Sequence, residues 1–410
     1  MSHVEALSSW KLEMTSRFPQ LSKPQATVLA LWSFGMVMTG SCGLTTVSYF
    51  LAALLGRKEN TLRQRLREWY RSKDDKKGEK RCEIEVASCF APLFKWVLSL
   101  WPAHEKRLAL ALDATTLGQR FTVLAICVLC RSCSIPVAWV VLPATEKNSW
   151  KLHWLSLLKQ LHEVVPEDWT VIVCADRGLY AKWLYDAICD LKWHPFLRIN
   201  RQGTYRPNNE DRFRPLSRLI TRHGSSWSGY VTCFKTNPLK CTLLSIWEEG
   251  YDEPWLILTD LPVEQANVCW YGLRAWIECG FKHTKRSGWQ WQNTRMSDSK
   301  RATLKWLALA VATLWVVSVG SEVEVNQPAS GISELPPTHL ARRWRKNKAQ
   351  ERTLSCFRRG ILAIRAALLS GQLLPMGSLY PEAWPKKLAQ ILYFKSKRTF
   401  FPPRVLALAA

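Results

Sequence analysis

The chain has 410 residues, 47% of them hydrophobic, which is enough to support a large core and two or three smaller units. Its 57 Lys and Arg residues against 33 Asp and Glu leave a formal charge of +24 and a pI near 9.7. Such a field attracts polyanions, so nucleic acid is the expected partner. The 13 cysteines are scattered, mostly in apolar runs, which is typical of reduced buried thiols rather than of a disulfide framework.

The N-terminal region contains a long uncharged segment, residues 26–55, that could span a bilayer by length alone. The sequence TGSCGLTT in its middle carries two glycines and several hydroxyl groups. It therefore divides the segment into two pieces that are each too short to cross. Since no signal-peptide pattern begins the chain either, we expect no membrane segment and a cytosolic location with reduced thiols.

A DNA-binding element is predicted directly after this segment. The run LTTVSYFLAALLG predicts a helix that ends at Gly56, and residues 57–81 form a basic segment. Helix, tight turn and basic helix resemble a helix-turn-helix. The alternative is a solvated helix face with a charged tail.

The middle of the chain predicts a mixed α/β sheet, because three runs rich in Val, Leu, Ile and Cys precede alternating helices and strands. The expected elements are strands at 107–113, 121–130 and 135–142, a helix at 149–164 with Ser149 as N-cap, a strand ending at Asp176, a helix at 181–191 and a strand at 194–200. The three early strands are spaced like an antiparallel meander. The fold class indicated is a sheet flanked by helices.

Two aspartates follow apolar runs of strand type. Asp113 closes RLALALDATTLG, and Asp176 closes the apolar part of WTVIVCADRGLY, where Gly178 allows a sharp turn. An aspartate in this position is often only a turn or helix cap. Two such strands, followed by a helix with a third acid, instead indicate carboxylates that converge at one sheet edge and need cations to neutralise them.

The segment 201–262 has a different character and predicts a β-rich insertion. It begins with a polar, arginine-rich run broken by prolines, and SGYVTCFK, CTLLSIWEE and PWLILTD then resemble short strands. Asp260 ends one of these strands. Together with Glu146 in PATEKNSW it is a rival for the third acid, although neither has phosphate-binding cations on its own helical face.

The third acid is expected on a helix with a specific signature. Tyr271, Arg274, Glu278 and Lys285 follow the spacing Y-x2-R-x3-E-x6-K in YGLRAWIECGFKHTK. Steps of three, four and seven residues stay on one helix face, which would place one carboxylate beside two cations and a phenol. The alternative is an amphipathic surface helix with an ordinary ion pair between Arg274 and Glu278.

Three acids suit hard divalent cations, because Mg2+ takes a few carboxylates, water and phosphate oxygens as ligands. A softer metal site is the competing hypothesis, since Cys127, Cys130 and Cys133 have C-x2-C-x2-C spacing. The fourth ligand and the following proline of an iron–sulfur motif are missing. The three cysteines also lie in a run that predicts two adjacent strands, which favours buried thiols.

The motifs DATT, ADRG and Y-x2-R-x3-E-x6-K resemble those of the DDE insertion-sequence transposases, over roughly residues 107–296. That family has a ribonuclease-H-like fold, with the acids on the first strand, after the fourth strand, and on a helix beyond a β-rich insertion. The resemblance implies that Asp113, Asp176 and Glu278 are the catalytic acids and the ligands of two Mg2+ ions, with Mn2+ as a substitute. Asp113 would bridge both ions, and each of the other acids would complete one site.

The resemblance also implies how the chain holds DNA. Tyr271, Arg274 and Lys285 would bind the phosphate near the cut end, and an aromatic residue of the insertion would stack on a flipped base. Trp247 and Trp255 are the candidates for that role. Paired cutting of two element ends implies a homodimer on DNA.

The C-terminal part predicts a core helix around residues 306–321, a linker at 326–337 and a second basic stretch at 342–359. The expected organisation is a helical DNA-binding region (1–100), a catalytic core in two parts (101–200 and 263–325), the insertion (201–262) and a basic helical C-terminal region (326–410). The hypothesis is a cut-and-paste DNA transposase. A metal-dependent nuclease without strand transfer and a non-catalytic DNA-binding regulator are the alternatives.

Overall fold

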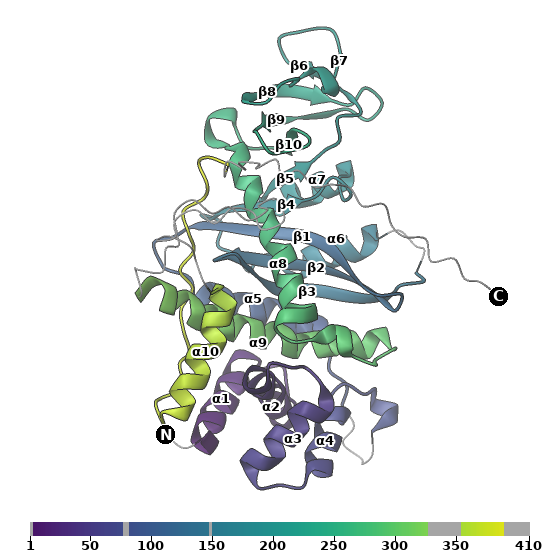
Figure 1. Cartoon of the computed structure of the whole chain (residues 1–410). Coiled ribbons are helices and arrows are strands. Elements are labelled where there is room, and N and C mark those ends of the chain that lie inside the picture. Colours follow the sequence, from purple (N-terminus) through teal and green to yellow (C-terminus); the bar gives the residue numbers. More distant parts are fainter. Residues whose placement is uncertain (1–2, 77–81, 147–149, 327–353, 389–410) are drawn as a thin grey trace, which may run out of the picture.

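The computed structural model describes residues 3–76, 82–146, 150–326 and 354–388. These residues form one ten-stranded sheet in the order β3-β2-β1-β4-β5-β10-β9-β8-β6-β7, with helices on both faces (Figure 1). The strands are β1 (Arg107–Leu117), β2 (Phe121–Cys130), β3 (Cys133–Pro143), β4 (Thr170–Ala175), β5 (His194–Arg198), β6 (Thr204–Pro207), β7 (Arg214–Pro215), β8 (Ser225–Cys233), β9 (Leu239–Trp247) and β10 (Trp255–Thr259).

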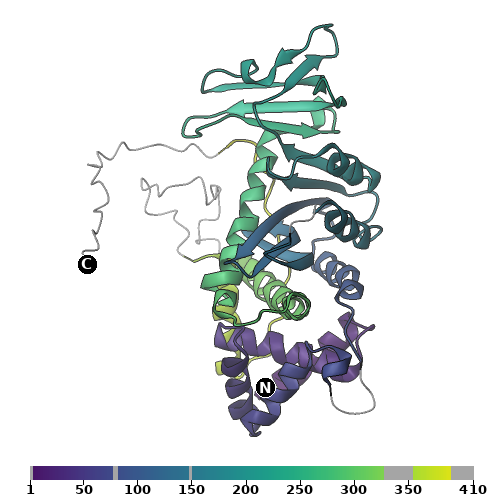
Figure 2. The ribbon, with the colours of Figure 1, turned by 90° about the vertical axis from the view of Figure 1, so that its right-hand side faces the viewer.

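The first five strands have the ribonuclease-H-like arrangement that the sequence predicts. Strands β1, β2 and β3 form an antiparallel meander, and β4 and β5 add in parallel beside β1. Helices α6 (Lys151–Gln160) and α7 (Lys182–Asp190) make the connections on one face, while α8 (Ala275–Lys282) and α9 (Ser299–Asn326) cover the other (Figure 2). The fold class is therefore confirmed. Ser149, the expected N-cap of α6, lies outside the described residues.

The β-rich insertion is not a separate unit. Strand β10 pairs with β5, and β9, β8, β6 and β7 follow outward, so the insertion continues the central sheet. Apolar strands β9 and β10 bury most of their side chains, whereas β8 alternates between exposed and half-buried positions over most of its length. The insertion is thus fixed to the core by backbone hydrogen bonds at β5.

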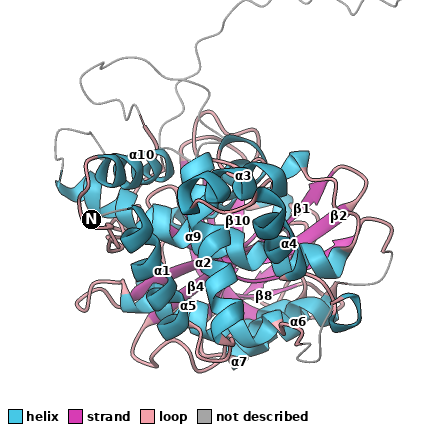
Figure 3. Cartoon of the chain, turned by 90° about the horizontal axis from the view of Figure 1, so that it is seen from below, coloured by secondary structure: helices cyan, strands magenta, loops and turns pink. Residues whose placement is uncertain are grey.

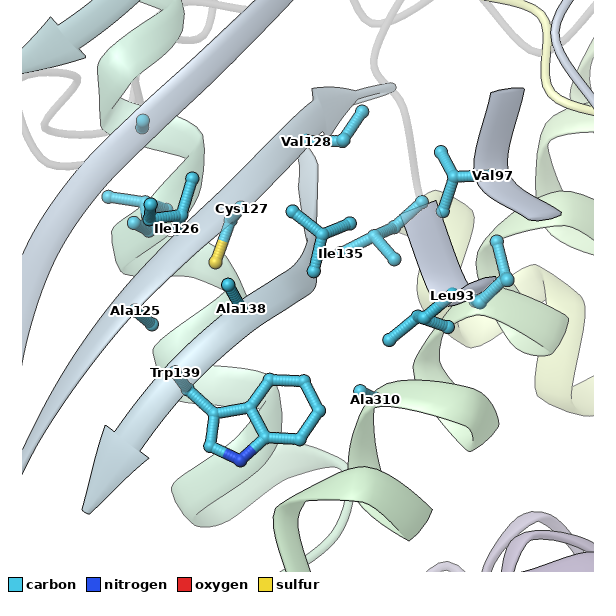
Figure 4. Close-up of a cluster of buried hydrophobic side chains, with 14 of the residues drawn as sticks. Leu93, Val97, Ala125, Ile126, Cys127, Val128, Ile135, Ala138, Trp139 and Ala310 are labelled. Carbon is cyan, nitrogen blue, oxygen red and sulfur yellow. The ribbon is translucent and has the colours of Figure 1, made fainter. Parts of the chain in front are cut away.

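The core on the α9 side of the sheet explains why β2 and β3 are continuous apolar runs. Ile135 and Trp139 of β3 face Leu93 and Val97 of helix α5 (Phe90–Ser99), with Ala310 of α9 beside them (Figure 4). Because helices cover both faces here, all ten residues of β2 are buried.

Helix α9 is the long apolar helix that the sequence predicts around residues 306–321. It is the one helix in the described part of the chain with the length and composition of a membrane span, and 94% of its apolar window is buried inside the protein. Helix α10 (Cys356–Leu369) packs along it, with Gly360 against the Val316 carbonyl group. An added Cβ at Gly360 would overlap that carbonyl oxygen, so the close approach requires glycine.

The N-terminal helices α1 (His3–Arg17), α2 (Lys23–Thr39), α3 (Leu44–Leu55) and α4 (Glu59–Glu68) pack beneath α9, at the end of the molecule opposite the insertion (Figure 1). The uncharged segment 26–55 is split as expected, because α2 and α3 meet at 96°. The Lys305 ammonium of α9 lies 2.9 Å from the centre of the Trp32 ring of α2, and it joins the N-terminal bundle to the core.

Candidate active site

The sheet brings two of the predicted acids together. Parallel pairing of β1 with β4 ends at Leu112 opposite Ala175, and the next residue on each strand is an aspartate. Asp176 follows its strand as predicted. The expectation that Asp113 ends its strand is wrong: β1 continues to Leu117, because it stays paired with β2 beyond the end of β4.

The third acid comes from the helix that crosses this edge, but the signature residues do not share one regular helix. Tyr271 and Arg274 lie in a 3₁₀ segment, Val268–Arg274, Glu278 lies on α8, and Lys285 lies in a π-helical turn, His283–Ser287. The expectation of a single α-helix is therefore wrong. Tighter and wider turns at its two ends re-aim the flanking side chains relative to Glu278.

Arg274 lies between the three acids. Its Nη2 donates to Asp113 Oδ2 at 2.8 Å and lies 3.8 Å from Asp176 Oδ2, and its Nη1 donates to Glu278 Oε1 at 2.7 Å. The Arg274 side chain is only 9% exposed. One guanidinium thus offsets part of the negative charge of three carboxylates that would otherwise repel one another more strongly.

The surroundings shift the two aspartates in opposite directions. Burial raises the pKa of Asp113 above its usual value, although Arg274 opposes the change. Burial also acts to raise the pKa of Asp176, but Arg274, the backbone N–H of Arg177 and the Arg198 charge together lower it. Asp176 is the more exposed of the two, so it remains the stronger acid.

Tyr271 is buried against the same site. Its hydroxyl donates to Asp176 Oδ1 at 3.4 Å, and its ring packs edge-on against Trp255 with centroids 5.0 Å apart. Burial raises the pKa of the Tyr271 phenol, so the hydroxyl stays a hydrogen-bond donor. In this structure Tyr271 orients an acid directly.

Lys285 reaches the far side of the site. Its Nζ donates to Thr115 Oγ1, two residues beyond Asp113 on β1, at 2.9 Å. Burial, followed by the nearby Arg286 charge, lowers the pKa of Lys285. A half-buried ammonium beside the acids is well placed to meet a phosphate.

A cavity of about 180 Å³ opens beside Asp176, Arg274 and Glu278. Two arginines that the sequence does not identify as site residues, Arg177 and Arg198, also line this cavity. Arg177 forms an ion pair with Glu253 at 2.5 Å. The Nε of Arg198 is buried and has no hydrogen-bond partner among the described residues. Arg198 ends the strand next to β4, which is the signal that could have identified it. The cavity wall is therefore cationic on the side facing Asp176.

The rival acids have other partners. Asp260 Oδ1 lies 3.0 Å from His194 Nδ1. His194 begins β5, so this pair lies at the opposite end of the parallel strands from Asp176. Glu146 lies 3.1 Å from His153 Nε2. Neither carboxylate contacts Arg274 in the described residues.

The two candidate stacking residues differ in access. Trp255 is only 3% exposed and packs between Tyr251 and Tyr271, so its rings offer no free face to a base. The expectation for Trp255 is wrong in this conformation. Trp247 is half-buried, and the Arg201 guanidinium lies 5.4 Å from its ring centre.

The donor set has the chemistry of a hard-metal site, since three carboxylates surround one cation position. As the described side chains stand, however, no three Asp, Glu, His or Cys residues converge closely enough to hold a metal ion. Arg274 accounts for this spacing, because its guanidinium separates the carboxylates. The thiols of Cys127, Cys130 and Cys133 are all buried in the β2–β3 hairpin.

Comparison with known protein families agrees with the expectation that the chain has a DDE transposase core. Residues 104–315, more than half of the chain, match a family described as the transposase DDE domain. The match runs from just before β1 into α9, and it includes all three acids. No match was found among curated proteins. The chain therefore belongs to the family of proteins with a transposase DDE domain, a family of transposase-type enzymes that generally use divalent metal ions.

Proposed function

We propose that this chain is a cut-and-paste DNA transposase in which Asp113, Asp176 and Glu278 are the catalytic acids. The observation that carries the proposal is the convergence of these three carboxylates on one buried cation, Arg274, within a match to the transposase DDE domain. The +24 charge of the chain supports DNA as the substrate.

Asp113, Asp176 and Glu278 would hold two Mg2+ ions, which Mn2+ could replace. When bound, these ions supply charge stabilisation to an in-line displacement at phosphorus. Since Arg274 fills the space between the acids, its side chain must withdraw before they can close on metal ions. A phosphate of the element end is the natural partner for the released guanidinium.

The chemistry balances without an external energy source. Hydrolysis breaks one phosphodiester and leaves a 3′-hydroxyl and a 5′-phosphate. The freed 3′-hydroxyl then attacks a second phosphodiester, so that one ester forms as another breaks. Lys285 and Arg274 would hold the phosphate near the cut end, while Tyr271 orients Asp176. The sequence contains no G-x-x-x-x-G-K-[ST] loop, in agreement with a reaction that needs no nucleotide.

The proposed partners are the terminal repeats of an insertion element and its target DNA, bound by two copies of the chain. We propose a cytosolic location, where DNA is accessible and thiols stay reduced. Trp247 remains the candidate for stacking on a flipped base, since its ring is partly exposed and adjoins Arg201.

A joining assay tests the proposal. Duplexes carrying the inverted repeats that flank the gene would be incubated with the protein, target DNA and Mg2+. A transposase forms strands joined to the target, whereas a nuclease without transfer activity gives cut ends only. If Asp113→Ala left every measured activity unchanged, the chain would be a DNA-binding regulator and the proposal would fail.

A further inference from the structure

The three helices α2, α3 and α4 are joined by two short turns. Helix α3 ends at Gly56, which has φ 59°, a left-handed conformation that favours glycine. Residues 56–58 then lead directly into α4. A turn of this length between two packed helices is typical of a helix-turn-helix, in which the second helix enters the major groove of DNA.

Helix α4 has one buried face and one exposed face. Leu62 and Leu66 are 4% and 0% exposed and pack into the bundle. Asn60, Arg63 and Arg67 are exposed and follow the spacing i, i+3, i+7, which places them together on one exposed face of α4 that adjoins the leucine face. In Figure 3 the helix lies on the outer surface of the molecule, beside α3.

The backbone of α4 is fixed by contacts on its inner side. The Trp32 indole of α2 donates to the Leu66 carbonyl oxygen at 3.1 Å, and the Trp69 indole donates to the Gln25 carbonyl oxygen at 3.2 Å. Both bonds connect the last turn of α4, or the residue after it, to α2. Because these contacts hold α4 rigidly against α2, the exposed face of α4 can meet a binding partner in one defined orientation.

The exposed side chains are those that read base edges. Arginine pairs with the two acceptors of guanine, and asparagine pairs with the donor and acceptor of adenine, in the major groove. Helix α3 exposes Thr45, Thr46 and Tyr49 but carries no charged residue, so it lacks this chemistry. Gln64 of α4 donates to Glu68 at 2.6 Å and is therefore already engaged.

We propose that α4 is a recognition helix and that Arg63 and Asn60 determine which base sequence the chain selects in double-stranded DNA. Arg57 and Lys58, both exposed in the turn before α4, hold the flanking phosphates. This inference rests on the proposed function, because the terminal repeats are the DNA to be selected.

The test is selection from random-sequence duplexes on the immobilised full-length chain, followed by sequencing. The wild type should enrich one motif. Arg63→Ala should lose the preference at one position of it and bind the wild-type motif roughly tenfold or more weakly. Arg57→Ala should enrich the same motif. The slope of its log affinity against log salt concentration should be smaller than that of the wild type by about one phosphate contact. Lys95→Ala, which removes an equal charge from an exposed site on α5, is the control and should change neither.

Two results would overturn the inference: no enriched motif with the wild type, or the same motif and affinity with Arg63→Ala. Arg63 is exposed, so thermal melting can verify that the variant folds. Glu278→Gln separates this inference from the catalytic proposal. It should enrich the wild-type motif, and a wild-type chain that enriches a motif but fails to join strands would refute the catalytic proposal alone.

Discussion

Replacing Arg274 by methionine would remove the one cation that separates the three acids. Breaking a buried ion pair by removing one partner costs about 3–5 kcal/mol. Here Asp113 is 18% exposed, whereas Glu278 and Asp176 are 30% and 36% exposed, so water screens part of the effect. We therefore expect a loss at the lower end, about 3 kcal/mol. In a chain of 410 residues, that corresponds to a fall in Tm of roughly 3–4 °C.

Metal ions should repair this defect selectively. With the guanidinium gone, the carboxylates can close on Mn2+, which stabilises the folded state by about 2.7 kcal/mol when the ion is at a hundred times its Kd. Melting curves without DNA, at increasing Mn2+, would measure this. Arg274→Met should gain much more Tm from Mn2+ than the wild type. Arg222→Met, a change at an exposed arginine of the insertion, should behave like the wild type. Equal Mn2+ shifts in the wild type and Arg274→Met would refute the account of Arg274.

Three further outcomes are expected. Because the pKa of Asp113 is raised in the folded chain, this group destabilises the fold increasingly as pH rises through that raised value. The Tm of Asp113→Asn minus that of the wild type should thus grow as the pH rises above about 4, the usual pKa of an aspartate, in metal-free buffer. Lys285→Ala should weaken binding of DNA ends that carry a terminal phosphate by roughly tenfold, while leaving the Mn2+ affinity unchanged. Gly360→Ala should cost about 3 kcal/mol in denaturant unfolding, since its Cβ would overlap the Val316 carbonyl oxygen.

Each of these has a contrary result, and two have a control variant. Asp190→Asn changes an exposed aspartate, so its Tm difference from the wild type should not vary in this way with pH. If the Tm difference for Asp113→Asn did not change with pH, the proposed effect of burial on Asp113 would be contradicted. Equal losses of DNA and Mn2+ binding would remove Lys285 from its phosphate role. Leu369→Ala alters a residue of α10 that is 83% exposed, and it should be nearly neutral; a Gly360→Ala variant of similar stability would show that α10 can shift away from α9.

The order of the core elements could be predicted because local signals specify them. Continuous apolar runs identify β2 and β4, and the left-handed glycine after α3 identifies a helix end. The position of Asp176 followed from the same logic, since β4 is followed at once by a turn. The end of a strand could not be predicted where it depends on pairing with a neighbouring strand. Strand β1 runs past Asp113 only because β2 continues to pair with it.

The contacts within the site could not be predicted from the spacing of the signature. The spacing places Arg274 and Glu278 on neighbouring turns, and it predicts their ion pair as one alternative. That the same guanidinium also meets Asp113 depends on how α8 crosses the sheet, which is a long-range contact. The burial of Trp255 likewise depends on Tyr271, sixteen positions later in the sequence. The predicted basic stretch 342–359 falls mostly outside the described residues.

The central claim, that Glu278 completes a catalytic triad with Asp113 and Asp176, is tested most directly by Glu278→Gln in a joining assay with pre-cut element ends. The amide keeps the shape of the side chain and removes its charge. The account predicts unchanged binding of the ends and no joined product with either Mg2+ or Mn2+. Joined product at the wild-type rate would contradict it.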